Sequence, residues 1–99
     1  MTLIFPLGVR ARNLAEFLTA IKYLNHGTIY FHFYEARMRL GEGVDDFSKW
    51  FEVALGKKGL ADRIRSIDPF MHAIDGIREH IIEAVDEEVR KDMETGGRG

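Results

Sequence analysis

The aromatic-rich run Thr28–Leu40 constrains the fold most, because it has to become either a central strand or a central helix. Its first half holds residue types typical of strands, but Glu35–Leu40 are helix formers and no turn residue separates the halves. At helical spacing most of the circumference is apolar, through Ile29, Phe33, Ala36 and Leu40 on one face, widened by Tyr30, Phe31, Tyr34 and Met38. We therefore predict a helix over 28–40 at the centre of an all-α bundle.

The same spacing gathers His32, Glu35 and Arg39 into one narrow polar strip. In a central helix these groups cannot all face water, and an unpaired buried charge is costly. Two interpretations stay open. The strip is either a self-paired internal network or the wall of a binding cleft for a ligand or partner. The second interpretation adds nearby side chains to that cleft: Tyr30, Tyr34 and His26.

Start and stop signals predict helices on both sides of this run. Asn13 is a good N-cap for a first helix that Gly27 ends, and Asp45 or Asp46 caps a third helix that Gly56 ends. The apolar stripes of these two helices are Leu14, Phe17, Leu18, Ile21 and Leu24, and Phe47, Trp50, Phe51, Ala54 and Leu55.

Two further helices and an extended arm complete the prediction of about five helices. A short helix covers 60–67, and Asp68 followed by Pro69 is a strong start signal for a long last helix. Residues 1–11 are apolar and irregular, which predicts an extended N-terminal arm with a short strand. We expect one helical domain over 1–93 and a disordered tail over 94–99.

Composition narrows the classes of protein that the chain can belong to. It has 99 residues, no cysteine and a formal net charge of −2. Disulfides and thiolate metal sites are therefore excluded, and no overall field attracts nucleic acid or an anionic membrane. The sequence also lacks glutamine and a long apolar run, and has two asparagines. We expect a cytoplasmic protein from a heat-adapted, archaeal source, with no nucleic-acid or membrane partner.

Three histidines have an acid three residues later: His32/Glu35, His72/Asp75 and His80/Glu83. Two such pairs could supply imidazole and carboxylate ligands to a metal. The di-iron bundle signature runs in the opposite order, Glu-x-x-His, and acids are abundant in these helices. We therefore interpret the pairs as polar helix faces, and predict neither a metal nor a cofactor.

The segment Asp45–Phe51 combines an acidic helix start with an aromatic stripe. The two acids favour a helix N-terminus because of the helix dipole. Trp50 has two interpretations, a core residue or the anchor of an interface.

Several short motifs in order resemble an uncharacterised prokaryotic family known only as a domain of unknown function. They are Ala11-Arg-Asn-Leu14, Ile29-Tyr-Phe-His32, Asp45-Asp-Phe-Ser-Lys-Trp50, Leu55-Gly56 and Ser66-Ile-Asp-Pro69. The match covers about residues 8–90. The resemblance implies a small module that stands alone or joins larger proteins, sugar-metabolism enzymes such as glycosyltransferases among them. It brings no catalytic residue, but it draws attention to His32, Asp46 and Trp50.

No catalytic signature stands out, so the function we expect is that of a binding or regulatory module rather than an enzyme. It would act on a partner protein or as a homodimer. The alternative is a small-ligand or metal-binding domain with its site around His32, Glu35 and Arg39.

Overall fold

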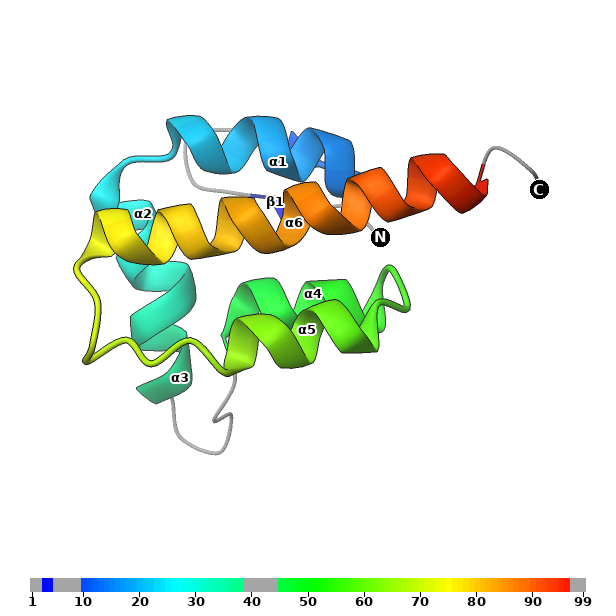
Figure 1. Cartoon of the computed structure of the whole chain (residues 1–99). Helices are drawn as coiled ribbons and strands as arrows, with labels where there is room; N and C mark the ends of the chain where they lie inside the picture. Colours follow the sequence, from blue (N-terminus) through cyan, green and yellow to red (C-terminus); the bar gives the residue numbers. More distant parts are fainter. Residues whose placement is uncertain (1–2, 5–9, 39–44, 97–99) are drawn as a thin grey trace.

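The computed structural model describes residues 3–4, 10–38 and 45–96, and these form an all-α bundle with a short extended arm. The elements are β1 (Leu3–Ile4), β2 (Arg10–Ala11), α1 (Leu14–Tyr23), α2 (His26–Ile29), the π-helix η2 (Tyr30–Glu35), α3 (Ala36–Met38), α4 (Asp46–Val53), α5 (Lys58–Arg65) and α6 (Ile74–Gly96). β1 and β2 pair antiparallel. Figure 1 shows α6 running along the molecule with α1 on one side and α4 and α5 on the other. The predicted fold class is confirmed.

Local signals set the starts of α1 and α4 where the sequence predicted them. Asn13 accepts a hydrogen bond from the Glu16 N–H at 2.9 Å and caps α1. Asp45 caps α4 by accepting from the Ser48 N–H at 2.7 Å. Gly56 has φ +66° in the turn between α4 and α5, a conformation that costs glycine little.

Phe17 of α1 contacts three aromatic rings of α4 in the core. Its ring centroid lies 5.3, 5.8 and 5.0 Å from those of Phe47, Trp50 and Phe51. Such edge and stacked contacts add to the free energy of burying the rings. The stripes of α5 and α6 complete the core with Leu60, Ala61, Ile64, Ile77, Ile81, Ala84 and Val85.

The helical segment 26–38, made of α2, η2 and α3, differs from the prediction in its start, its winding and its place. It begins at His26, capped by Asn25, so Gly27 lies inside a helix rather than after one. The predicted inner face is buried at Ile29, Phe33 and Ala36. The segment nevertheless closes one end of the bundle and is not central, because only one of its sides packs on α4 and α6. The predicted last residue, Leu40, lies outside the described residues.

The predicted start of the last helix is also wrong. The Asp68 carboxylate accepts from the Phe70 N–H at 2.8 Å, and its carbonyl accepts from the Met71 N–H at 3.1 Å. These bonds close a single turn, and α6 begins only at Ile74. The turn does not grow into a helix because Phe70 and Met71 are exposed, so no burial holds the next residues in a helix.

α6 continues to Gly96 and so includes three residues that the sequence assigned to a tail. Within the described ranges, no helix has the length and apolar content needed to cross a membrane.

Candidate functional site

A buried carboxylate at the start of α4 organises the polar interior. Asp45 is fully buried and accepts from both the N–H and the Oγ of Ser48, each at 2.7 Å. The Arg37 Nη2 lies 3.5 Å from its second oxygen. Burial raises the pKa of Asp45, while the Ser48 bonds and the Arg37 charge oppose that rise. Both oxygens of the carboxylate thus have partners inside the fold.

Arg37 extends this network from α3 to the end of α5. Its guanidinium donates to the carbonyls of Ile64 and Ile67 at 3.0 and 2.9 Å, and lies 4.2 Å from the centroid of the Phe33 ring. The carbonyls at a helix C-terminus lack partners within the helix, so a cation there is favourable. Arg37 therefore joins three helices.

His32 of η2 contacts the start of the same helix, α4. Its Nδ1 lies 2.9 Å from Oδ2 of Asp46, and the imidazole is buried beside Phe47, with ring centroids 5.7 Å apart. A carboxylate on Nδ1 fixes the orientation and tautomer of an imidazole, as in acid–base sites. Here the pair ties η2 to α4.

The predicted strip of His32, Glu35 and Arg39 is not a single seam in the structure. His32 is buried against Asp46, Glu35 is exposed, and Arg39 lies outside the described residues. A π-helix has more residues per turn than the α-helix assumed from the sequence, so side chains three apart no longer stack. Helical spacing missed Asp46 because it lies on another helix; the family resemblance had marked both His32 and Asp46.

The outer side of the same segment presents apolar rings to solvent. The rings of Tyr30 and Tyr34 stack at 5.0 Å, and Tyr34 meets Phe70 edge to face at 5.4 Å. Met38 follows one turn later, and Met71 follows Phe70. Tyr30, Met38, Phe70 and Met71 are 44%, 56%, 69% and 73% exposed. We call the five residues Tyr30, Tyr34, Met38, Phe70 and Met71 the aromatic face.

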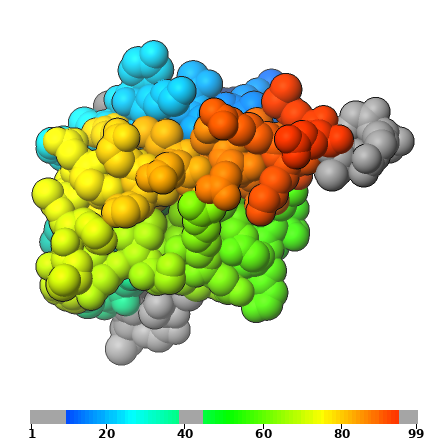
Figure 2. Space-filling view, viewed as in Figure 1, coloured from blue at the N-terminus to red at the C-terminus, as the bar shows by residue number. Residues whose placement is uncertain are grey.

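Figure 2 shows the loop before α6 at the outer edge of the molecule, where Phe70 and Met71 lie. The sequence named Tyr30 and Tyr34 as candidates but missed Phe70, because Phe70 fell inside the long last helix predicted to start at Asp68 and Pro69. Trp50, the other aromatic candidate, is 5% exposed and stacks on Phe17 in the core.

The remaining histidines lie where α2 meets the start of α6. His26 Nε2 is 2.7 Å from Oδ1 of Asp75. The ring of His72 lies against that of His80, with centroids 4.5 Å apart. His72 precedes α6, so His72 and Asp75 do not share one polar helix face as the sequence predicted. The described residues hold no group of three or more His, Cys, Asp or Glu that could bind a metal.

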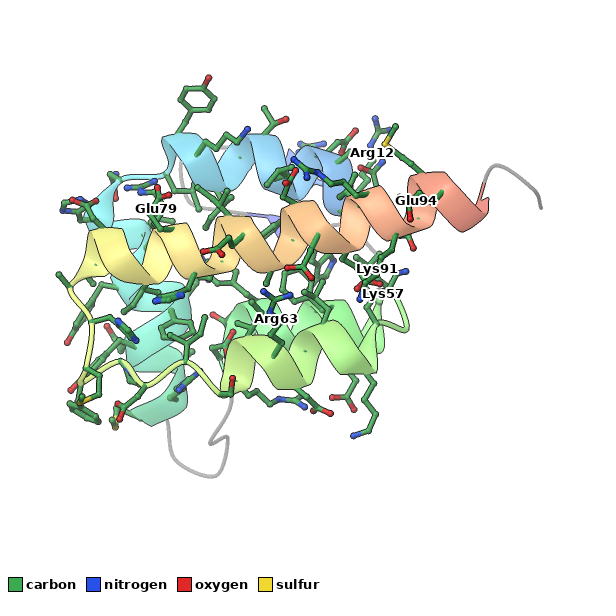
Figure 3. The ribbon with its side chains drawn as sticks, in the orientation of Figure 1. Arg12, Lys57, Arg63, Glu79, Lys91 and Glu94 are labelled. Atoms are coloured by element: carbon green, nitrogen blue, oxygen red, sulfur yellow. The ribbon has the colours of Figure 1, made fainter. Side chains whose placement is uncertain are left out.

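Basic side chains gather where the α4–α5 turn meets α6: Lys57, Lys58, Arg63 and Lys91. Figure 3 labels three of them. Lys57 Nζ lies 2.6 and 3.2 Å from carboxylate oxygens of Asp92 and Glu88, which raise its pKa, and Arg63 pairs with Glu87 at 3.1 Å. These acids of α6 offset the positive charge, so the basic side chains form ion pairs that connect the α4–α5 turn and α5 to α6. The same pairing makes them a poor site for an anion.

A family model described as "Family of unknown function (DUF5752)" matches residues 1–86. Neither the curated proteins nor the solved structures include a match to the chain.

Proposed function

Since the chain belongs to that family of unknown function, we propose a role from its own surface: it is a small binding module that pairs with a second copy of itself through the aromatic face. The observation that carries this proposal is the exposure of Tyr30, Met38, Phe70 and Met71 on neighbouring elements. Contiguous apolar surface of this kind marks interaction sites.

The area of the aromatic face fits a modest dimer. A side chain of this size buries about 150–250 Å² when fully covered, so the exposed fractions of four of these residues, Tyr30, Met38, Phe70 and Met71, amount to roughly 500 Å². A standard interface takes about 800 Å² from each partner. The face therefore supplies the apolar centre of such an interface, and polar neighbours would supply the rim.

The chemistry of the aromatic face favours a second copy over a charged partner. None of its five side chains is charged, so two copies meet without like-charge repulsion or the loss of a solvated ion. A two-fold axis brings the protruding Phe70 of each copy to the stacked Tyr30 and Tyr34 of the other, and aromatic rings pack well edge to face.

The alternative, a ligand or metal site at His32, Glu35 and Arg39, has less support. His32 is buried and bonded to Asp46, whereas Glu35 is exposed, so the two side chains do not share a cleft. For the setting we propose the cytoplasm of a heat-adapted, archaeal organism. That proposal rests on the sequence, which has no cysteine or glutamine and 30% charged residues.

Sedimentation equilibrium of the full chain up to ~200 µM tests the pairing, because the dimer fraction follows concentration. We expect a reversible monomer–dimer equilibrium that Phe70→Asp weakens at least tenfold, since it places two carboxylates in the interface. Met93→Asp is the matched control, because Met93 is 74% exposed on α6 and outside the aromatic face. A wild-type chain that stays monomeric, or equal effects of the two variants, contradicts the proposal and leaves a different partner protein for this surface.

A further inference from the structure

Two histidines face one another at the start of α6. His72 comes from the loop before the helix and His80 from its second turn, and their ring centroids are 4.5 Å apart with the planes at 61°. Gly76 lies beneath the first ring: a Cβ there would stand 3.6 Å from the His72 Cβ and 4.0 Å from its Nδ1. A glycine inside a helix costs about 1 kcal/mol relative to alanine, and both distances are ordinary contacts, so the His72 ring lies close to the backbone of α6 here.

We propose that His72 and His80 chelate a divalent transition metal ion of the zinc, nickel and copper class. Two imidazoles on one tetrahedral ion, with each nitrogen about 2.0–2.1 Å from the metal, have ring centroids about 5 Å apart. The observed separation is close to that value, and because the rings now meet edge to face, both exposed side chains must rotate to turn a nitrogen of each toward one ion. Neutral imidazole is a ligand that these ions prefer.

The surroundings make this a two-ligand site. Asp75, the nearest acid in sequence to His72, is engaged by His26 at 2.7 Å and approached by Arg78 at 3.9 Å. No third acid or histidine among the described residues joins the pair. Water completes the coordination, so the ion exchanges with solvent and does not hold the fold together, unlike the closed four-ligand sites of structural zinc.

Chelation would act on the loop that carries part of the aromatic face. Phe70 and Met71 immediately precede His72, and a metal that joins His72 to His80 fixes this loop on α6. This consequence rests on the proposed function, since it matters only if the face pairs. Metal binding itself does not depend on it.

The test is a calorimetric and NMR titration of the full chain, free of any histidine tag, with zinc, nickel, copper, manganese and magnesium salts. We expect one ion per chain, bound in the order copper, then nickel and zinc, then manganese, with no binding of magnesium. His72→Ala and His80→Ala should each lower the zinc affinity at least tenfold. His26→Ala is the control, because it removes an exposed histidine of the same region. Its zinc affinity should not fall below that of the wild type, since the only acid that the change frees is Asp75, beside the site.

Zinc binding that survives unchanged in both His72→Ala and His80→Ala overturns the proposal. So does the absence of zinc binding at ~1 mM, well above the range of useful affinities. The Phe70→Asp variant separates this proposal from the pairing: it should bind zinc normally while failing to dimerise. Loss of zinc binding in that variant contradicts an independent site.

Discussion

The two sides of the helical segment 26–38 show opposite treatments of polar and apolar side chains. On the inner side, His32 and Arg37 are directed at neighbouring helices and reach their partners within hydrogen-bond distance. On the outer side, Tyr30 and Tyr34 stack on one another, and Tyr34 also meets Phe70, at the surface. A charged group is thus turned inward while aromatic rings face water.

The ends of α4 and α5 explain why charged and polar side chains point inward on this segment. The start of α4 offers two aspartates, and the end of α5 and the residues after it offer the carbonyls of Ile64 and Ile67. Buried polar groups are tolerated when such partners satisfy them. No comparable partner covers the outer rings among the described residues. The inner side should therefore determine stability and the outer side association, and each can be perturbed separately.

The largest effect should follow from Asp45→Ala. This change removes the acceptor of two Ser48 bonds and the counter-charge of Arg37, leaving buried donors unpaired. We expect the free energy of unfolding to fall by about 3 kcal/mol, as when one member of a buried network is removed. Urea denaturation followed by circular dichroism measures it.

The matched variant is Asp68→Ala, which also removes a carboxylate that accepts a backbone N–H, but at an exposed turn. It should cost less than about 1 kcal/mol. Equal losses in the two variants would mean that burial at the start of α4 does not decide the stability.

The cap at Asp45 shows what the sequence can predict. A side-chain oxygen three residues before the N–H it accepts is a local relation, as at Asn13, and so is the left-handed Gly56. The apolar stripe that includes Phe17 likewise follows from the fixed spacing of residues along one helix. These features needed no knowledge of the neighbouring helices, and they were predicted, with the cap of α4 narrowed to Asp45 or Asp46.

What failed depends on contacts between elements. In the structure η2 is π-helical and its His32 packs against Phe47 of α4, whereas helical spacing alone assumes the tighter α-helix. The Asp68 start signal formed its turn, but nothing buries the residues that follow it. The pairing of His72 with His80 then follows from the same irregular loop, which no helical period describes.

A smaller effect should appear in the pH dependence of stability. Because burial raises the pKa of Asp45 above its ordinary value of 3.8, the folded state binds this proton more tightly than the unfolded state. The contribution of Asp45 to stability therefore improves as the pH falls through the raised pKa toward 3.8, and its ionisation costs stability above that window. Asp45→Asn removes this titration. The free energy of unfolding of the wild type should therefore rise relative to that of the variant as the pH falls through this range. A difference that stays constant, or changes in the other direction, would contradict the assigned shift.

The smallest effect should come from Glu35→Gln, which tests whether the inner and outer sides of the segment 26–38 really differ in their effect on stability. Glu35 lies in η2 only three residues after His32, but it is exposed while His32 is buried against Asp46. Exposed substitutions away from caps and networks usually change stability by less than about 0.5 kcal/mol. His32→Ala should cost more than 1 kcal/mol, because it leaves a cavity and removes the partner of a carboxylate. If thermal and urea unfolding give Glu35→Gln the larger loss, the polar strip first inferred from helical spacing is a real internal network, and the division between the two sides of this segment is wrong.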